Sequence, residues 1–306
     1  MVFIMNKNAI SKKSISFAQW GMQKQLANLW EICFAEQPRP TNFFFNNCFQ
    51  PQNCLLYKVG DQVAAMVHLL PAKIIEKGYL AQAHYIYAAA TLPEYRSKGY
   101  MASLLKCAAY VGERRGDRYS ILLPANRKLY DYYGKFGYVP NFETRFLALP
   151  FSEMQTAAVC GQKNKVLLAY QQIENTRNAQ IRFQSGSVVW DEKAISYAQG
   201  INKLYGGRLI CSQTGSQFAY ALCRMDGSSQ CEILELMADD STFVNLAANI
   251  LACMPAQNYK LRLPNNQKLL GGQGKVSYFG MTKPLGNITC NHIKSFSAPY
   301  LGLTLD

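Results

Sequence analysis

The sequence predicts a layered fold of the α/β or α+β class, and three observations support this prediction. Apolar residues make up 49% of the 306 residues and charged residues only 17%, so the chain can bury a large core. Short apolar or alternating runs, typical of strands, alternate along the chain with segments whose apolar residues recur at helical spacing. The length predicts about two domains.

Several classes of protein are disfavoured by the composition. No apolar run approaches the ~18 residues of a membrane span, and residues 1–20 lack the apolar stretch of a secretory signal, so we expect a cytoplasmic protein without a membrane partner. Ten cysteines in a chain of this length, without a signal, predict free, buried thiols. Cys-x-x-Cys is absent and His68, His84 and His292 are far apart, so we expect no metal site.

The first half opens with helices and continues with strands. Leu26, Leu29, Trp30 and Cys33 have the spacing of an amphipathic helix at 23–34. After Pro38 and Pro40 break the chain, we expect a short helix at 42–49, a hairpin from 55–59 and 63–70, and a second hairpin from 74–75 and 83–92. A loop then leads into a helix at 100–114, a strand at 119–123, a short helix at 129–136 and a strand at 142–149.

The second half repeats a similar order of elements. Residues 150–162 resemble a boundary or linker helix, and 166–170 and 181–183 are apolar segments. Helices are expected at 191–204 and 241–253, and strands at 208–212, 218–225, 231–237 and 260–263. The similar order suggests a tandem duplication, although no sequence identity between the halves is obvious.

Positive charge is concentrated in one stretch of the first half. The net charge is +13, and residues 96–135 hold nine basic and three acidic side chains. Such an excess attracts nucleic acid, an acidic membrane surface or a phosphorylated cofactor, and it is equally compatible with an ordinary solvated basic surface.

A strand, a polar loop and a helix follow one another directly at residues 88–114. Arg96 and Gly99 lie three residues apart in the loop. The first N–H groups of a helix have no intrahelical partner, and the helix dipole places partial positive charge there. Glycine lets a phosphate approach the backbone closely, and Arg96 and Lys98 add charge, so the segment suits a pyrophosphate.

Two motifs in this region resemble those of the GNAT superfamily of acetyl-CoA-dependent N-acetyltransferases. Residues 96–101, Arg-Ser-Lys-Gly-Tyr-Met, are similar to its R/Q-x-x-G-x-G/A pyrophosphate loop, with Met101 where many members have Gly or Ala. Residues 129–138 are similar to its closing L-Y-x-x-x-G-F motif, with Tyr133 at the family's tyrosine position. The Eis-like branch also carries a bulky residue at the position of Met101, and its Y-G-x-F-G-Y run resembles 133–138.

The resemblance implies an α+β tandem GNAT fold, with a mixed central sheet flanked by helices in each half. We expect a catalytic GNAT domain at 1–148 and a degenerate GNAT-like domain at 149–306. The second half has no Arg-x-x-Gly loop before a helix, so one acetyl-CoA site is expected. From the length of the sequence we expect no counterpart of the additional sterol-carrier-like domain of full-length Eis proteins.

The family also implies roles for individual residues. The strand before the loop offers backbone groups to the pantetheine arm, and the loop N–H groups hold the pyrophosphate. The cofactor-binding residues are then Ala89, Ala90, Thr91, Arg96, Ser97, Lys98, Gly99, Tyr100 and Met101. Asn126 either bonds the cofactor arm or caps a helix. Tyr133 is the candidate general acid, or else a core aromatic residue.

The general base is less well defined by the sequence. His84, Glu143 and the chain-terminal carboxylate at Asp306 are candidates, as is a water chain. Asp306 is favoured because the C-terminal carboxylate of Eis-like enzymes reaches the active site. His84 is expected to be a structural strand histidine, and Cys107 a packing residue without a histidine partner.

We therefore predict an enzyme that transfers an acetyl group from acetyl-CoA to a primary amine of a small molecule, peptide or protein. Direct attack in a ternary complex is the expected mechanism. One alternative is a non-catalytic acyl-CoA-binding protein of the same fold. A nucleic-acid-binding module, supported by charge and aromatic content alone, is a weaker alternative. The amine acceptor and the oligomeric state stay open.

Overall fold

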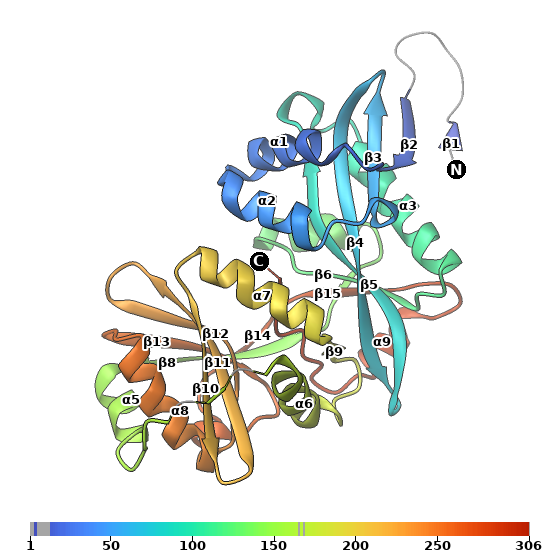
Figure 1. The fold of residues 1–306 in the computed structure, drawn as a ribbon. Coiled ribbons are helices and arrows are strands. Elements are labelled where there is room, and N and C mark those ends of the chain that lie inside the picture. The colour runs from blue at the N-terminus through green and yellow to red at the C-terminus, as the bar shows by residue number, and fades with distance from the viewer. Residues whose placement is uncertain (1–2, 5–12, 165, 168, 306) are drawn as a thin grey trace. The chain divides into compact units, whose positions relative to one another are not determined.

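The computed structural model describes residues 3–4, 13–164, 166–167 and 169–305 (Figure 1). These residues form two compact units that interleave along the chain. The first unit contains Met1–Lys73, Ala81–Pro140 and Met281–Ile293, and the second contains Ile74–Leu80, Asn141–Gly280 and Lys294–Asp306. The division into domains at 1–148 and 149–306 stays a prediction.

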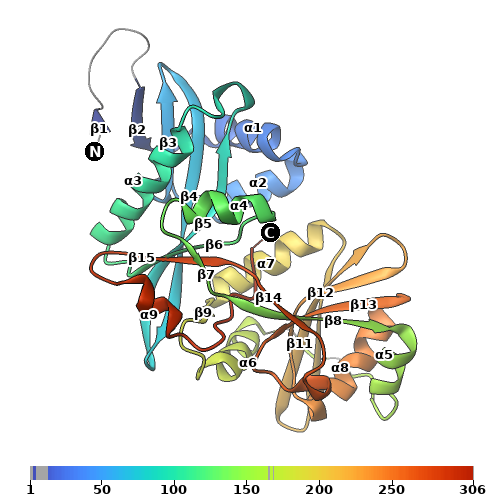
Figure 2. The same cartoon turned by 180° about the vertical axis from the view of Figure 1, so that it is seen from behind.

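A mixed sheet organises the first unit, and helices lie on both of its faces (Figures 1 and 2). Its strand order is β1-β2-β3-β4-β5-β6-β15-β7. The strands are β1 (Phe3–Ile4), β2 (Lys13–Phe17), β3 (Cys54–Val59), β4 (Gln62–Glu76), β5 (Tyr79–Thr91), β6 (Tyr119–Leu122), β7 (Val139–Pro140) and β15 (Met281–Pro284). The helices are α1 (Gln23–Phe34), α2 (Pro38–Asn47), α3 (Tyr100–Arg114), α4 (Arg127–Gly134) and most of α9 (Cys290–Lys294).

Strands β3, β4 and β5 form a long meander, which differs from the two separate hairpins that we expected. Strand β4 continues through Pro71 to Glu76 instead of ending at residue 70. Pro71 is exposed within this strand. Pairing with neighbouring strands therefore overrides the local signal for a break, and the two expected hairpins become one continuous element.

Helix α2 begins earlier than the sequence suggested. Pro38 and Pro40, read as breakers, instead lie in the first turn of α2. The first N–H groups of a helix have no intrahelical partner, so proline costs little there and its fixed φ favours helix entry.

An aromatic cluster packs α1 and α2 against one face of this sheet. The ring centroids of Trp30 and Phe44 lie 4.9 Å apart, and the His68 ring of β4 lies 4.9 Å from Phe44. Tyr87 of β5 joins them at 5.5 Å from Trp30. The spacing of Leu26, Leu29 and Trp30 therefore reflects a helix face that is buried on the sheet.

The opposite face is covered by α3 and α4. Leu104, Leu105 and Ala108 of α3 pack with Tyr133 of α4 and Ile86 of β5 in one core cluster. The helical spacing of the apolar residues in α3 is thus explained by burial against the sheet.

Strand β15 enters the first sheet from near the far end of the sequence. It pairs antiparallel with β6 through Met281↔Leu122 and Lys283↔Ser120, and with β7 through Thr282↔Val139. The sequence analysis placed no strand at these residues. A strand of four residues is too short to show the alternation of apolar and polar residues that predicts a strand. Its position is decided by pairing with strands that are distant in the sequence.

A second mixed sheet, of order β10-β11-β12-β13-β8-β14, organises the second unit. Its strands are β8 (Glu143–Pro150), β10 (Arg208–Thr214), β11 (Gln217–Asp226), β12 (Gln230–Met237), β13 (Asn258–Pro264) and β14 (Lys275–Tyr278). The helices are α5 (Phe151–Ala157), α6 (Tyr170–Ile181), α7 (Glu192–Leu204) and α8 (Asp240–Cys253), and β9 (Val188–Val189) pairs with β4. The apolar segment at 181–183 is therefore the end of α6 and the turn after it. The observed elements confirm the predicted α+β class.

A buried ion pair fixes the last described segment within the second unit. Arg177 Nε lies 3.1 Å from Glu235 Oε1, and both side chains are fully buried. The Arg177 guanidinium also donates to the carbonyl oxygens of Val188 and Leu301. Tyr220 donates to the second oxygen of Glu235 at 2.8 Å. These bonds hold the chain around Leu301 in the core of this unit.

Within the described residues, no helix is both long enough and apolar enough to cross a membrane. The ten cysteines are free thiols, as expected, but only Cys54, Cys223 and Cys231 are buried, and Cys160 and Cys253 are exposed.

Candidate active site

The end of β5 carries a bulge at the position where the resemblance places the thioester. Ala88 has a left-handed φ of +46°. Ile86 and Ala89 pack against the same core, whereas alternate residues of a regular strand share a face. The extra residue is the mark of a β-bulge, which bends the strand.

Strand β5 also runs beyond its pairing with β6. The parallel register joins Ala83 to Tyr119 and Tyr85 to Ile121, and β5 continues to Thr91. Ala89 and Thr91 are partly exposed, while Ala90 is buried. The bulged end can therefore offer backbone groups to an extended ligand arm.

The loop after β5 is held by two hydrogen bonds from its own basic residues. Arg96 Nε donates to the carbonyl oxygen of Thr91 at 3.1 Å. Lys98 Nζ donates to the carbonyl oxygen of Glu94 at 2.8 Å. These bonds fix the loop and leave both cationic groups on the surface beside the helix entry.

Gly99 forms the entry of α3 with a left-handed φ of +77°. A Cβ built on Gly99 meets no described atom within 4 Å, so the space over this backbone is open. In the described part of the chain no side chain caps this end of α3, a helix of 15 residues. Its first N–H groups and the helix dipole therefore make a site for an anion.

Cys33 of α1 also contacts this loop, a contact that the sequence analysis missed. Its thiol is hydrogen-bonded to the Arg96 guanidinium and to the backbone of Thr91, while burial raises the pKa of the thiol. Helical periodicity explained Cys33 as a packing residue. Arg96 is 63 positions from Cys33 in the chain, so no local sequence pattern could indicate their contact.

Tyr133 lies near the end of α4 and shares a core cluster with Tyr100, the first residue of α3. Its side chain is 9% exposed, and its ring makes edge contacts with Tyr132 and Tyr138. Burial, and secondarily the proximity of Tyr132, raises the pKa of Tyr133 to about 12. The phenol is therefore a protonated donor at neutral pH, as a general acid must be.

Asn126 caps helix α4. Its Oδ1 accepts the Leu129 N–H at 3.3 Å, and its side chain is exposed. Asn126 therefore acts as the helix cap that the sequence suggested, and its role in binding a cofactor stays a prediction.

The three candidate bases have different surroundings. His84 is buried, with Nδ1 2.8 Å from Asp117 Oδ2 and its ring against Gly112. Gly112 lies about 18 Å along α3 from its N-terminus at 1.5 Å per residue, which favours a structural role for His84. Glu143 accepts a hydrogen bond from Asn265 at 2.6 Å in the second unit. Asp306 lies outside the described residues.

No group of three or more His, Cys, Asp or Glu residues in the described ranges is arranged to hold a metal ion. The arrangement instead provides a pre-formed anion site beside a bulged strand and a protonated phenol on the same face of the sheet. Such a site suits binding of a phosphorylated acyl donor and protonation of its leaving group.

Comparison with known proteins agrees with this chemistry. Residues 15–140 match the family model described as an acetyltransferase (GNAT) domain. No curated protein sequence is significantly similar to the chain. The residues 15–140 thus belong to the GNAT acetyltransferase family, and the protein is an acyltransferase.

Solved structures show that the likeness of fold extends beyond those residues. A probable N-acyltransferase from Enterococcus faecalis V583 is 16% identical, with a TM-score of 0.70 over 90% of this chain and 73% of that one. A GCN5-related N-acetyltransferase from Anabaena variabilis is 15% identical, with a TM-score of 0.71 over the same shares. Eis1 from Mycobacterium abscessus is 10% identical, with a TM-score of 0.65 over 88% of this chain and 73% of that one. The predicted α+β GNAT fold is confirmed.

Proposed function

We propose that this protein transfers an acetyl group from acetyl-CoA to a primary amine by direct attack in a ternary complex. The uncapped entry of α3 at Gly99, directly after the bulged end of β5, is the observation that carries the proposal. The N–H groups of residues 96–101 would bind the pyrophosphate. Ala89, Ala90 and Thr91 would bind the pantetheine arm.

Tyr133 would act as the general acid in this reaction. The amine nitrogen attacks the acetyl carbonyl carbon, a C–N bond forms, and the C–S bond breaks. The leaving thiolate takes the proton of the Tyr133 hydroxyl. The pKa of about 12 keeps the phenol protonated at neutral pH, so the hydroxyl can donate a hydrogen bond to the departing sulfur as negative charge develops there.

The attacking amine must also lose a proton. We propose Asp306 as the acceptor, on the resemblance to Eis-like enzymes, with a water chain as the second candidate. Extension of the chain by two glycines after Asp306 moves the terminal carboxylate away, and Asp306→Asn removes the side-chain carboxylate, so the two variants together measure this role. Turnover unchanged in both variants would remove Asp306 from the mechanism.

A thermal-unfolding titration tests the cofactor assignment first. Acetyl-CoA at ~100 times its Kd should stabilise the folded chain by about 2.7 kcal/mol, which raises Tm by a few degrees in a protein of this size. Adenosine and short DNA serve as controls. A rise with acetyl-CoA alone, followed by thiol release with a panel of primary amines, would support the proposal. A rise with DNA alone would contradict it.

A further inference from the structure

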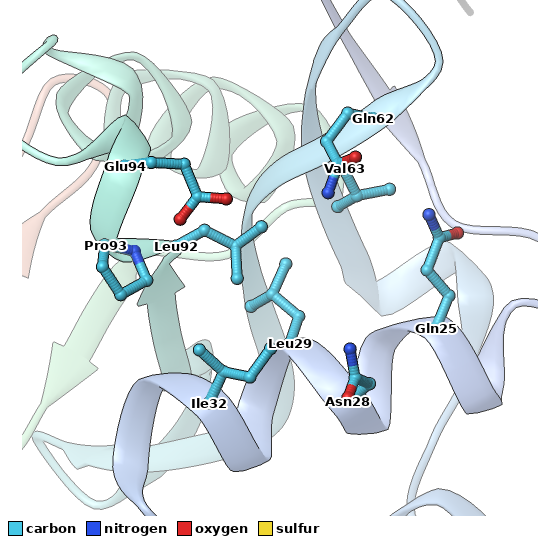
Figure 3. Close-up of a pocket in the computed structure, with 9 residues that line it drawn as sticks. All are labelled: Gln25, Asn28, Leu29, Ile32, Gln62, Val63, Leu92, Pro93 and Glu94. Carbon is cyan, nitrogen blue, oxygen red and sulfur yellow. The ribbon is translucent and has the colours of Figure 1, made fainter.

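A cavity of about 200 Å3 lies within the first unit, bounded by α1, the start of β4 and the loop after β5 (Figure 3). The volume is several times the ~30 Å3 of a water molecule in the liquid. It lies below the ~300–1,000 Å3 of pockets for drug-sized ligands. The cavity therefore has room for a ligand of a few non-hydrogen atoms and is too small for acetyl-CoA.

The polar lining of this cavity can accept hydrogen bonds at one carboxylate and three carboxamide oxygens, and the carboxamides can also donate. It consists of the carboxylate of Glu94 and the carboxamides of Gln25, Asn28 and Gln62. Of the nine lining residues, Glu94 alone is ionisable. Figure 3 shows its carboxylate directed into the space between α1 and the start of β4. A ligand that donates hydrogen bonds and carries positive charge fits this set.

The basic side chains of this loop bond to main-chain carbonyl oxygens, Arg96 to that of Thr91 and Lys98 to that of Glu94. The Lys98 ammonium also lies 5.2 Å from the centroid of the Tyr95 ring. Among the salt bridges of the described residues, none involves Glu94. In a chain of net charge +13, this carboxylate remains available to an external cation.

The remaining lining is apolar. Leu29, Val63 and Leu92 are each at most 5% exposed and form part of the cavity wall. These three side chains have little surface left to bury. Ile32, which is 50% exposed, supplies the accessible apolar surface that an aliphatic chain would cover, at about 25 cal/mol for each Å2 removed from water. The lining thus combines one anionic group and three amides with an apolar wall.

We propose that this cavity binds a small primary alkylammonium ion. Its ammonium group donates to Glu94 and to the carboxamide oxygens, and its alkyl chain covers the apolar wall. A carboxylate partner favours the charged form of an amine, so the bound group stays protonated and is not a nucleophile. The site therefore holds a cation rather than presenting an amine for acetylation.

The cavity is distinct from the proposed acetyl-CoA site. None of the nine lining residues is among those proposed to bind acetyl-CoA, although Leu92, Pro93 and Glu94 follow Thr91 directly along the chain. The inference therefore does not depend on acetyl transfer, and it is tested by binding alone.

A protein-observed NMR titration of the full-length, 15N-labelled chain tests the proposal. The probe is n-butylammonium chloride at constant ionic strength, and n-butanol is the neutral isostere. We expect saturable shifts of the side-chain amide signals of Gln25, Asn28 and Gln62. Glu94→Gln should weaken the apparent affinity about tenfold or more, because one charge-assisted hydrogen bond is lost.

A matched control separates the cavity from surface charge. Glu113→Gln removes an exposed carboxylate of α3 that does not line the cavity, so its affinity should equal that of the wild type. Absence of saturable shifts in the wild type would overturn the proposal. Equal affinities of the wild type and Glu94→Gln, or of butylammonium and butanol, would overturn it as well.

Discussion

Ile86 and Ala89 of β5 face the same core although they are three residues apart, because Ala88 between them has a φ of +46°. A left-handed backbone costs a residue with a Cβ roughly 1–2 kcal/mol. The strand keeps this conformation at the point where it leaves its pairing with β6 and leads into the anion site. Local strain at such a position is consistent with a functional role.

Substitution of Ala88 measures that strain. Ala88→Gly should leave stability unchanged or raise it by up to about 1 kcal/mol, because glycine adopts positive φ without a Cβ clash. Ala88→Val should lower stability by about 1–3 kcal/mol, because a β-branched side chain is poorly tolerated at positive φ. Urea unfolding provides both free energies. If Gly and Val had the same effect, the bulge at Ala88 would be in doubt.

Gly99→Glu should abolish binding of acetyl-CoA. The open space over Gly99 would receive a carboxylate where we propose a pyrophosphate, and like charges repel. Gly116→Glu is the matched control, because Gly116 also has a positive φ, +88°, and open space but lies beyond the other end of α3. Calorimetric titration should show wild-type affinity for the control. Wild-type affinity in Gly99→Glu would refute the assignment of the loop.

Tyr133→Phe should lower kcat by about 10²-fold or more and leave the affinity for acetyl-CoA nearly unchanged. Tyr132→Phe, on the adjacent and less buried ring, should retain activity. The pKa of about 12 means that the acid stays protonated below that pH, so a loss of activity between pH 8 and 10 would not report its ionisation. Turnover equal to that of the wild type in Tyr133→Phe would remove this residue from the mechanism.

His68 should make the first unit sensitive to acid. Burial lowers the pKa of His68 to about 3, although a hydrogen bond with the Tyr87 backbone opposes the shift. Between the unfolded value near 6.5 and the folded value, the unfolded chain binds the extra proton. Because of His68, the free energy of unfolding therefore falls as the pH falls below about 6.5, by up to ~1.4 kcal/mol per pH unit.

His68→Leu tests this contribution. Leucine keeps an apolar side chain against Trp30 and Phe44 and has no proton to gain. The loss of unfolding free energy from pH 7.5 to pH 5 should be smaller in the variant than in the wild type. Identical losses in urea titrations at the two pH values would contradict the role of His68.

Arg177→Met should destabilise the second unit by about 3–5 kcal/mol, because it leaves the Glu235 carboxylate buried without its partner. The double variant Arg177→Met, Glu235→Leu should recover much of the loss, since no unpaired charge remains buried. Chemical unfolding of wild type, both single variants and the double variant completes the cycle. Additive losses would show that the two side chains do not act as a pair.

Local sequence signals identified most helices and strands in both units. Helix α1 begins and ends at the predicted residues 23 and 34, and β10, β11 and β12 lie within two residues of their predicted bounds. The Arg96–Gly99 loop and the Tyr133 motif also indicated the family before any contact was known. These features depend on periodicity, glycine positions and capping, and each of these signals comes from residues that are close together in the sequence.

The amino-acid sequence by itself determined the class of fold, the anion-binding loop and the tyrosine that we propose as the acid. The tertiary structure alone decided that β4 runs through Pro71, that β15 joins β6 and β7, and that Gln25, Gln62 and Glu94 line one cavity. Strand pairing and cavity lining depend on residues that are distant in the chain. Their energies come from contacts that only the folded molecule creates, so no local pattern records them.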